Sequence, residues 1–298
     1  MANLKEVRDR IASVKNTQQI TKAMKMVSAA KLRRAQDAIT QMRPYANKLD
    51  AMLRNILSNL EGDAGTVFGQ ARPVQRACLV VVTSSRGLCG AFNSNVIKAA
   101  LAAMDGKFSR VHERGNLSML FIGKKGFEYF NKRYADSVNI ISDYVNLFDD
   151  LSFDNTKRVA SYLMDAFRDG RYDAVEVAYG EFRNAAVQNT VHVPFLPVPK
   201  VEVEEGEVNH RADYIFEPSK EGLLSHLVPS ILQTQFHKFN LDTHASEHGA
   251  RMTAMDSATE NANELLRELK ISYNKARQEA ITNEILEIVG GAAALENG

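Results

Sequence analysis

The chain has 298 residues, of which 45% are apolar and 24% are charged, and this composition is typical of a soluble folded protein. The formal net charge is +1, so the whole chain has no electrostatic bias toward nucleic acid or membrane. Two cysteines, Cys78 and Cys89, are too few for a disulfide framework and favour a reducing compartment. The first residues lack the apolar core of a signal peptide, and no apolar run is long enough to span a membrane.

The two ends of the chain carry opposite charge. Residues 1–58 hold 12 Lys and Arg against 4 Asp and Glu, whereas residues 241–298 hold 5 against 10. Complementary charges flanking a helix pair set partner and orientation. We therefore expect the basic end and the acidic end to meet.

Residues 3–58 are predicted to form one long helix. Asn3 and Glu6 resemble a capping box at its start. Apolar residues then recur in steps of three and four at Leu4, Val7, Ile11 and Val14. We expect this pattern to slip once and to resume with Ile20, Met24 and Val27.

Pro44 is the one residue within this segment that opposes a helix, because it lacks a backbone N–H. The apolar spacing resumes directly after it, so a kink is predicted rather than an end. The glycine-containing residues 61–65 are predicted to be a linker.

Residues 75–200 alternate between strand and helix patterns. Residues 78–82 and 117–122 are continuous apolar runs, typical of buried parallel strands, and each leads through glycines into a helix. Further strands are predicted at 137–141 and 174–179, with a helix at 155–170 between them. Residues 187–198 contain Pro194 and Pro197, with Pro199 directly after them, and are predicted to form an edge strand. This alternation predicts a small open, Rossmann-like α/β sheet.

A helical pattern begins again at about residue 217 and leads into a heptad seam. A helix of 40 residues is about 60 Å long, more than a compact domain of this size needs, and so requires a partner helix. The seam residues follow one another in steps of four and three: Leu241, Ala245, His248, Met252, Met255, Thr259, Ala262, Leu266, Leu269, Tyr273, Ala276 and Ala280.

The predicted fold class is therefore α/β plus coiled coil, with long antiparallel terminal helices bracketing a small open α/β domain. The predicted parts are an N-terminal shaft helix (1–60), a globular α/β domain (75–200), an acidic connector (201–216) and a C-terminal shaft helix (217–298).

Two motifs within this framework suggest chemistry. His244, Glu247 and His248 match the H-x-x-E-H zinc-peptidase pattern, but His248 lies in the apolar seam and no partner motif supplies a third ligand. Residues 83–90 form a glycine-containing loop after a strand, as in phosphate-binding sites, but both common phosphate-binding motifs are absent. Packing is the favoured interpretation of both motifs, and also of Cys89 within the loop.

Four segments resemble one family, the γ subunit of bacterial F-type ATP synthase. They are Ile11–Val27 (IASVKNTQQITKAMKMV), Arg86–Gly90 (RGLCG), Ser246–Met252 (SEHGARM) and Tyr273–Ile285 (YNKARQEAITNEI). Ser85, where Asp is common, and Ala91, where Gly is common, depart from the family pattern. The similarity is strong in both terminal helices and weak in the middle domain.

The resemblance implies a central rotor stalk that couples c-ring rotation, driven by proton flow, to conformational cycling of the catalytic β subunits. The implied partners are the α and β subunits of F1, the ε subunit and the c-ring of Fo. It implies no catalytic, cofactor or metal residue in this chain, and a location at the cytoplasmic face of the cell membrane. The implied partner contacts are Met24, Lys25, Arg277, Gln278 and Thr282, with residues 285–295 in an apolar bearing.

One alternative of a different class stays open. The α/β domain could belong to a nucleotide- or phosphate-using enzyme, with the helices as a dimerisation arm. Binding of ATP that depends on Arg86 or Lys124 would favour this alternative.

Overall fold

The computed structural model describes residues 4–58, 67–198 and 220–296. The predicted linker at 61–65 and the connector at 201–216 lie outside these residues. The chain divides into two compact units: residues 1–27 with 252–298, and residues 28–251. We call these the shaft unit and the domain unit. The four-part division expected from the sequence stays a prediction.

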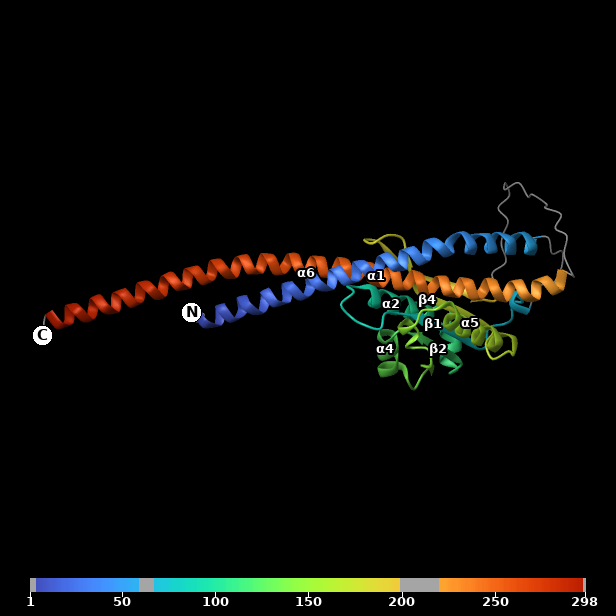
Figure 1. Ribbon diagram of the computed structural model, residues 1–298. Coiled ribbons are helices and arrows are strands. Elements are labelled where there is room, and N and C mark those ends of the chain that lie inside the picture. Colours follow the sequence, from blue (N-terminus) through green and yellow to red (C-terminus); the bar gives the residue numbers. More distant parts are fainter. Residues whose placement is uncertain (1–3, 59–66, 199–219, 297–298) are drawn as a thin grey trace, which may run out of the picture. The chain divides into compact units, whose positions relative to one another are not determined.

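Two long helices contribute to both units (Figure 1). α1 runs over Leu4–Ser58 and continues through Pro44, as expected from the apolar spacing on both sides of this residue. α6 runs over Lys220–Glu296 and continues through Pro229, which the sequence analysis did not consider.

The domain unit contains a five-stranded sheet in the order β3-β2-β1-β4-β5. The first four strands are parallel, and β5 pairs antiparallel with β4 as an edge strand. The remaining elements are η1 (Val67–Gly69), β1 (Ala77–Val82), α2 (Phe92–Asp105), α3 (Ser109–Glu113), β2 (Leu117–Ile122), α4 (Lys124–Tyr134), β3 (Asn139–Ile141), η2 (Leu147–Asp149), α5 (Phe153–Arg168), β4 (Ala174–Phe182) and β5 (Gln188–Leu196). The short α3 and η2 were not predicted.

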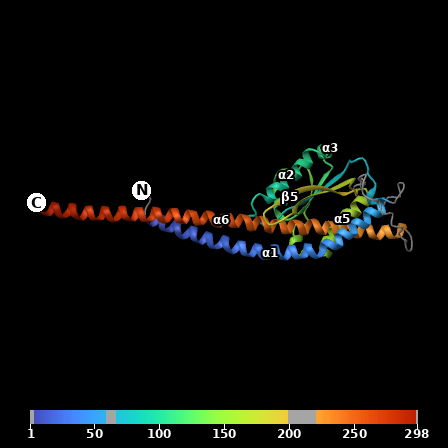
Figure 2. The same cartoon turned by 90° about the horizontal axis from the view of Figure 1, so that it is seen from above.

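Helices cover both faces of this sheet, which explains why its central strands are apolar throughout. β1 and β2 are buried along their whole length. On one face, side chains of α2, α3 and α4 complete the core, and on the other face those of α5 and α6 do so. Within this unit α6 lies between the sheet and α1 (Figure 2).

Because α6 is covered on two sides here, residues 228–251 are almost all buried or half-buried, including many polar ones. Several of these polar side chains donate to a carbonyl one turn back on the same helix: Thr234 to Ser230, Asn240 to Phe236 and Thr243 to Phe239, each at 2.8 Å. These bonds satisfy the two threonine hydroxyls and the amide nitrogen of Asn240 without a partner on another element, while Asn240 Oδ1 is buried without a hydrogen bond.

Two glycines allow close contacts between the layers of the domain unit. A Cβ atom at Gly180 of β4 would lie 2.4 Å from Cε2 of Phe92, and one at Gly249 of α6 would lie 3.2 Å from the Ala185 carbonyl oxygen. Any larger residue at either position would require its neighbour to move. Gly249, which interrupts an otherwise regular helical pattern, therefore has a packing role.

Candidate functional site

A heptad seam runs along α1 without the slip that the sequence predicted. The least exposed residues of α1 recur in steps of three and four at Leu4, Val7, Ile11, Val14, Gln18, Thr21, Lys25, Ser28, Leu32, Ala35, Ile39, Met42, Ala46 and Leu49. The prediction that Ile20 and Val27 join this seam was wrong. The seam positions between Val14 and Leu32 are occupied by the polar residues Gln18, Thr21, Lys25 and Ser28. In the sequence, the apolar pattern therefore appears on another face of the helix.

In the shaft unit, three polar pairs join α1 to α6 across this seam. The Gln18 amide nitrogen donates to Asn263 Oδ1, and Lys25 Nζ forms an ion pair with Asp256 Oδ1. Between them, the hydroxyl oxygens of Thr21 and Thr259 lie 2.8 Å apart. The residue numbers of each pair add up to 280 or 281, so the helices are antiparallel in this unit.

The outward face of α1 carries an apolar surface. Ile20, Met26 and Val27 have 59%, 61% and 57% of their surface exposed. Ala23 and Ala30 are exposed beside them, and Met24 is half-buried. Exposed apolar residues grouped on one helix face indicate a surface for another protein. We call Ile20, Ala23, Met26, Val27 and Ala30 the outer stripe.

The C-terminal part of α6 extends beyond the start of α1. With the pairing above, Leu4 lies opposite the residues near Ala276 of the shaft unit, and residues 281–292 are exposed on every side. Large apolar side chains are exposed there: Ile281, Ile285, Leu286, Ile288 and Val289. Arg277 and Gln278 are exposed, while the Thr282 hydroxyl donates to the Gln278 carbonyl at 2.9 Å.

A buried polar cluster lies at the end of the domain unit. Arg251 donates from Nη1 to Glu247 Oε1 at 2.7 Å, and from Nη2 to the carbonyls of Arg86 and Gly87 at 2.9 and 3.2 Å. The Nε2 atoms of His244 and His248 lie 3.2 Å apart. Arg251 therefore ties α6 to the loop after β1. Sequence reasoning missed this role, because the partners are about 165 positions away.

This cluster is poorly suited to a zinc ion. Burial, together with the cations Lys31 and Arg251, lowers the pKa of His244 to about 4. Burial, the neighbouring His244 and the same cations lower the pKa of His248 to about 3. Glu247, which would act as general base in a peptidase, is paired with Arg251. Its pKa is raised because burial outweighs that pairing. The same two cations that neighbour the imidazoles would repel a metal ion.

The loop at 83–90 does not have the geometry of a phosphate cradle. A cradle directs backbone N–H groups at the anion, whereas Arg86 and Gly87 direct their carbonyls at Arg251. The first N–H groups of α4 are also occupied: Lys125 N donates to the Ser84 carbonyl and Gly126 N to Thr83 Oγ1.

The two thiols are buried among packing partners. Burial raises the pKa of Cys78 to about 12, so this thiol stays protonated. Cys89 Sγ accepts from the Asn93 amide at 3.2 Å, next to the Ser84 hydroxyl. This environment agrees with the packing interpretation of Cys89.

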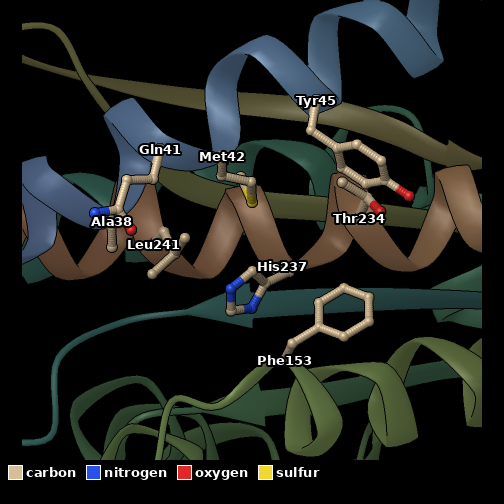
Figure 3. Close-up of a pocket in the computed structure, with 8 residues that line it drawn as sticks. All are labelled: Ala38, Gln41, Met42, Tyr45, Phe153, Thr234, His237 and Leu241. Carbon is tan, nitrogen blue, oxygen red and sulfur yellow. The ribbon is translucent and has the colours of Figure 1, made fainter.

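A hollow of about 460 Å³ lies between α1, α5 and α6 within the domain unit (Figure 3). Its lining residues are Ala38, Gln41, Met42, Tyr45, Phe153, Thr234, His237 and Leu241. His237 Nδ1 bonds to Thr156 Oγ1 at 2.8 Å, and Thr234 donates back to its own helix. The two polar side chains contributed by α6 are therefore already engaged.

The fold and these surfaces define a class of protein: a chain with an open α/β domain and with two end helices that pair antiparallel in the shaft unit and expose apolar surfaces there. Among the described residues, no three side chains of the metal-binding types are grouped so as to hold an ion. None of the described helices is apolar enough over sufficient length to cross a bilayer.

Comparison with known proteins gives the family. The family model described as ATP synthase matches residues 3–295. The ATP synthase gamma chain of Cytophaga hutchinsonii is 53% identical over 300 residues, covering 100% of both chains, and that of Flavobacterium psychrophilum is 51% identical over 99% of this chain and 100% of the relative. The chain therefore belongs to the ATP synthase gamma chain family, whose members are parts of an ATP synthase complex.

Solved structures share the fold. A chain of the mitochondrial ATP synthase of Euglena gracilis, from an assembly of OSCP, F1 and c-ring, has a TM-score of 0.68 at 22% identity, covering 99% of this chain and 95% of that chain. A chain from the central stalk and c-ring of the Tetrahymena thermophila enzyme has a TM-score of 0.54 at 21% identity, covering 80% of this chain and 99% of that chain.

Proposed function

We propose that this protein is the central rotor stalk of a proton-translocating ATP synthase and has no catalytic site of its own. The observation that carries the proposal is the antiparallel pairing of α1 and α6 in the shaft unit. The family membership and the central-stalk chains of similar fold support it. The catalytic sites would then lie on the β subunits, with this chain turning between them.

A rotor stalk must hold its own helices together while it releases each partner in turn. The seam supplies the first property, with Val7, Thr21, Met255 and Ala262 buried between the helices of the shaft unit. The outer stripe and the exposed end of α6 supply surfaces for the second. A stalk shifts the β subunits only if it interacts differently with their open and closed states.

Five residues are proposed to contact the β subunits: Met24, Lys25, Arg277, Gln278 and Thr282. Met24 borders the outer stripe, Lys25 is half-buried at the seam, and Arg277 and Gln278 are exposed on α6. Single contacts between exposed polar groups contribute about 0–1 kcal/mol, which suits contacts that form and break at every step. Residues 285–295 are proposed to turn in an apolar bearing formed by α and β.

The α/β domain is proposed to contact ε and the c-ring, and the complex to lie at the cytoplasmic face of the bacterial inner membrane. The neighbouring structures of similar fold come from F1 and c-ring assemblies. The alternative of a nucleotide-using enzyme is disfavoured by the carbonyl groups that its loop directs at Arg251.

Co-purification tests this proposal. The chain would be expressed with α and β subunits of the same enzyme, with an affinity tag on β alone. We expect one copy of this chain for three αβ pairs, and we expect a variant truncated after Ile271 to be retained poorly. A full-length chain that is folded but absent from the tagged complex would overturn the proposal.

A further inference from the structure

The ion pair between Lys25 and Asp256 lies at the edge of the seam that is open to solvent. Lys25 holds a seam position, and the exposed Met26 and Val27 that follow it point to other sides of the helix. Its ammonium pairs with Asp256 across the helix pair, and the two side chains are 39% and 45% exposed. The ammonium of Lys25 can therefore be reached by a protein that surrounds the helix pair.

Lys25 cannot satisfy two carboxylates equally well at the same time. An exposed ion pair is weak in water. Another carboxylate can therefore replace Asp256 as the partner of Lys25. If an acidic group of the surrounding subunits approaches Lys25, it must compete with Asp256 for the ammonium. The strength of the external contact therefore depends on the internal one.

The helix pair does not depend on this ion pair for its cohesion. Thr21 and Thr259 are hydrogen-bonded one turn away, and Met255 and Ala262 are buried on either side of Asp256. Asp256 can thus be changed while the helices remain paired, which separates a role in partner release from a role in folding.

We propose that Asp256 is a positioning residue that competes with carboxylates of the catalytic subunits for Lys25 and so lets the stalk release them. The inference rests on the proposed function, because it requires that this chain sits inside a ring of α and β subunits. The residue that sets the strength of the contact then lies on the stalk itself.

The test measures how fast this chain dissociates from a reconstituted α3β3 ring. We expect Asp256→Asn to slow dissociation roughly three- to tenfold at low ionic strength, because Lys25 loses its internal partner, and to have little effect in high salt. Asp256→Glu, which keeps the carboxylate, should dissociate at a rate close to that of the parent. In a Lys25→Gln background, Asp256→Asn should change nothing.

A merely structural ion pair predicts the opposite sign, since a loosened helix pair would dissociate faster. Circular dichroism of each full-length variant checks that the helices are intact. Dissociation of Asp256→Asn at the parent rate or faster overturns this inference and leaves the proposed function standing. Failure of the parent chain to bind the ring overturns both.

Discussion

Arg251 is the residue on which the junction between α6 and the loop after β1 depends. Its guanidinium satisfies the buried Glu247 and two loop carbonyls at once. Breaking a buried ion pair by removing one partner leaves an uncompensated charge, which typically costs about 3–5 kcal/mol. Arg251→Gln should lower the free energy of unfolding by about this amount, measured by denaturant titration of the full chain.

A matched control separates the buried charge from the lost contacts. The double variant Glu247→Gln with Arg251→Met removes both charges, so it should cost less than Arg251→Gln alone. A double variant that is as unstable as the single one would show that the loop contacts, rather than the buried charge, dominate.

His244 and His248 make the chain sensitive to acid. Their folded-state pKa values, about 4 and about 3, lie below the ordinary value of 6.5 because of burial and the nearby Lys31 and Arg251. The unfolded chain therefore binds more protons as the pH falls below about 6.5. The stabilisation is complete above that pH and is lost as the pH falls toward the folded-state values.

Replacing both histidines with Gln should flatten the dependence of stability on pH between about 6.5 and 4, compared with the parent chain. Thermal unfolding monitored by circular dichroism at several pH values measures this. The comparison with the parent cancels the titration of the carboxylates, which is common to both chains. Equal slopes for the two chains would contradict the assignment.

At the scale of elements, α6 changes its surroundings along its length. Residues 228–251 are covered by the sheet and by α1 in the domain unit, whereas residues 281–292 are exposed on every side in the shaft unit. Substitutions in the two parts should therefore have different consequences, on folding in the first part and on partner binding in the second.

Arg277→Ala combined with Gln278→Ala tests the exposed part. Both side chains are exposed, so the melting temperature of the isolated chain should change little. ATP synthesis by membranes containing the variant complex should fall, because these side chains are proposed to contact the β subunits. The matched control is Glu284→Ala, an exposed change outside the proposed contacts. Synthesis at the control level would contradict the proposed contact.

The elements predicted best from the sequence are those whose buried residues are mostly apolar. The apolar runs at 78–82 and 117–122 predict strands because both faces are covered, and the structure places β1 and β2 there. The seam of α6 was also predictable, since most of its residues are apolar. The α1 seam was misread, because Gln18, Thr21, Lys25 and Ser28 are satisfied by, or packed against, partners that local sequence does not reveal.

Little of the candidate site follows from local sequence alone. The partner of Lys25 is 231 positions away and that of Arg251 is 165 positions away. Spacing along a helix gives the face on which a residue lies, but only the paired register shows which residue it meets. The outer stripe did leave a trace in the sequence, since Ile20, Met24 and Val27 form an apolar pattern that the seam does not use.

At the scale of the whole molecule, the account assigns mechanical work to a chain with ordinary composition and almost no net charge. The residues on which it depends are the polar pairs that join the helices of the shaft unit, and the exposed surfaces around them. Removing a single exposed contact should reduce coupling by a modest factor. Removing the helix pair should abolish coupling.

Rotation of this chain inside an immobilised α3β3 ring is the measurement that tests the central claim most directly. A probe would be attached to a cysteine introduced at the exposed Lys132 of α4, since both native cysteines are buried. On addition of ATP, the account predicts that the probe turns in one direction with three pauses in each revolution, one for each catalytic subunit. A probe that stays fixed while the same complexes hydrolyse ATP would contradict the account.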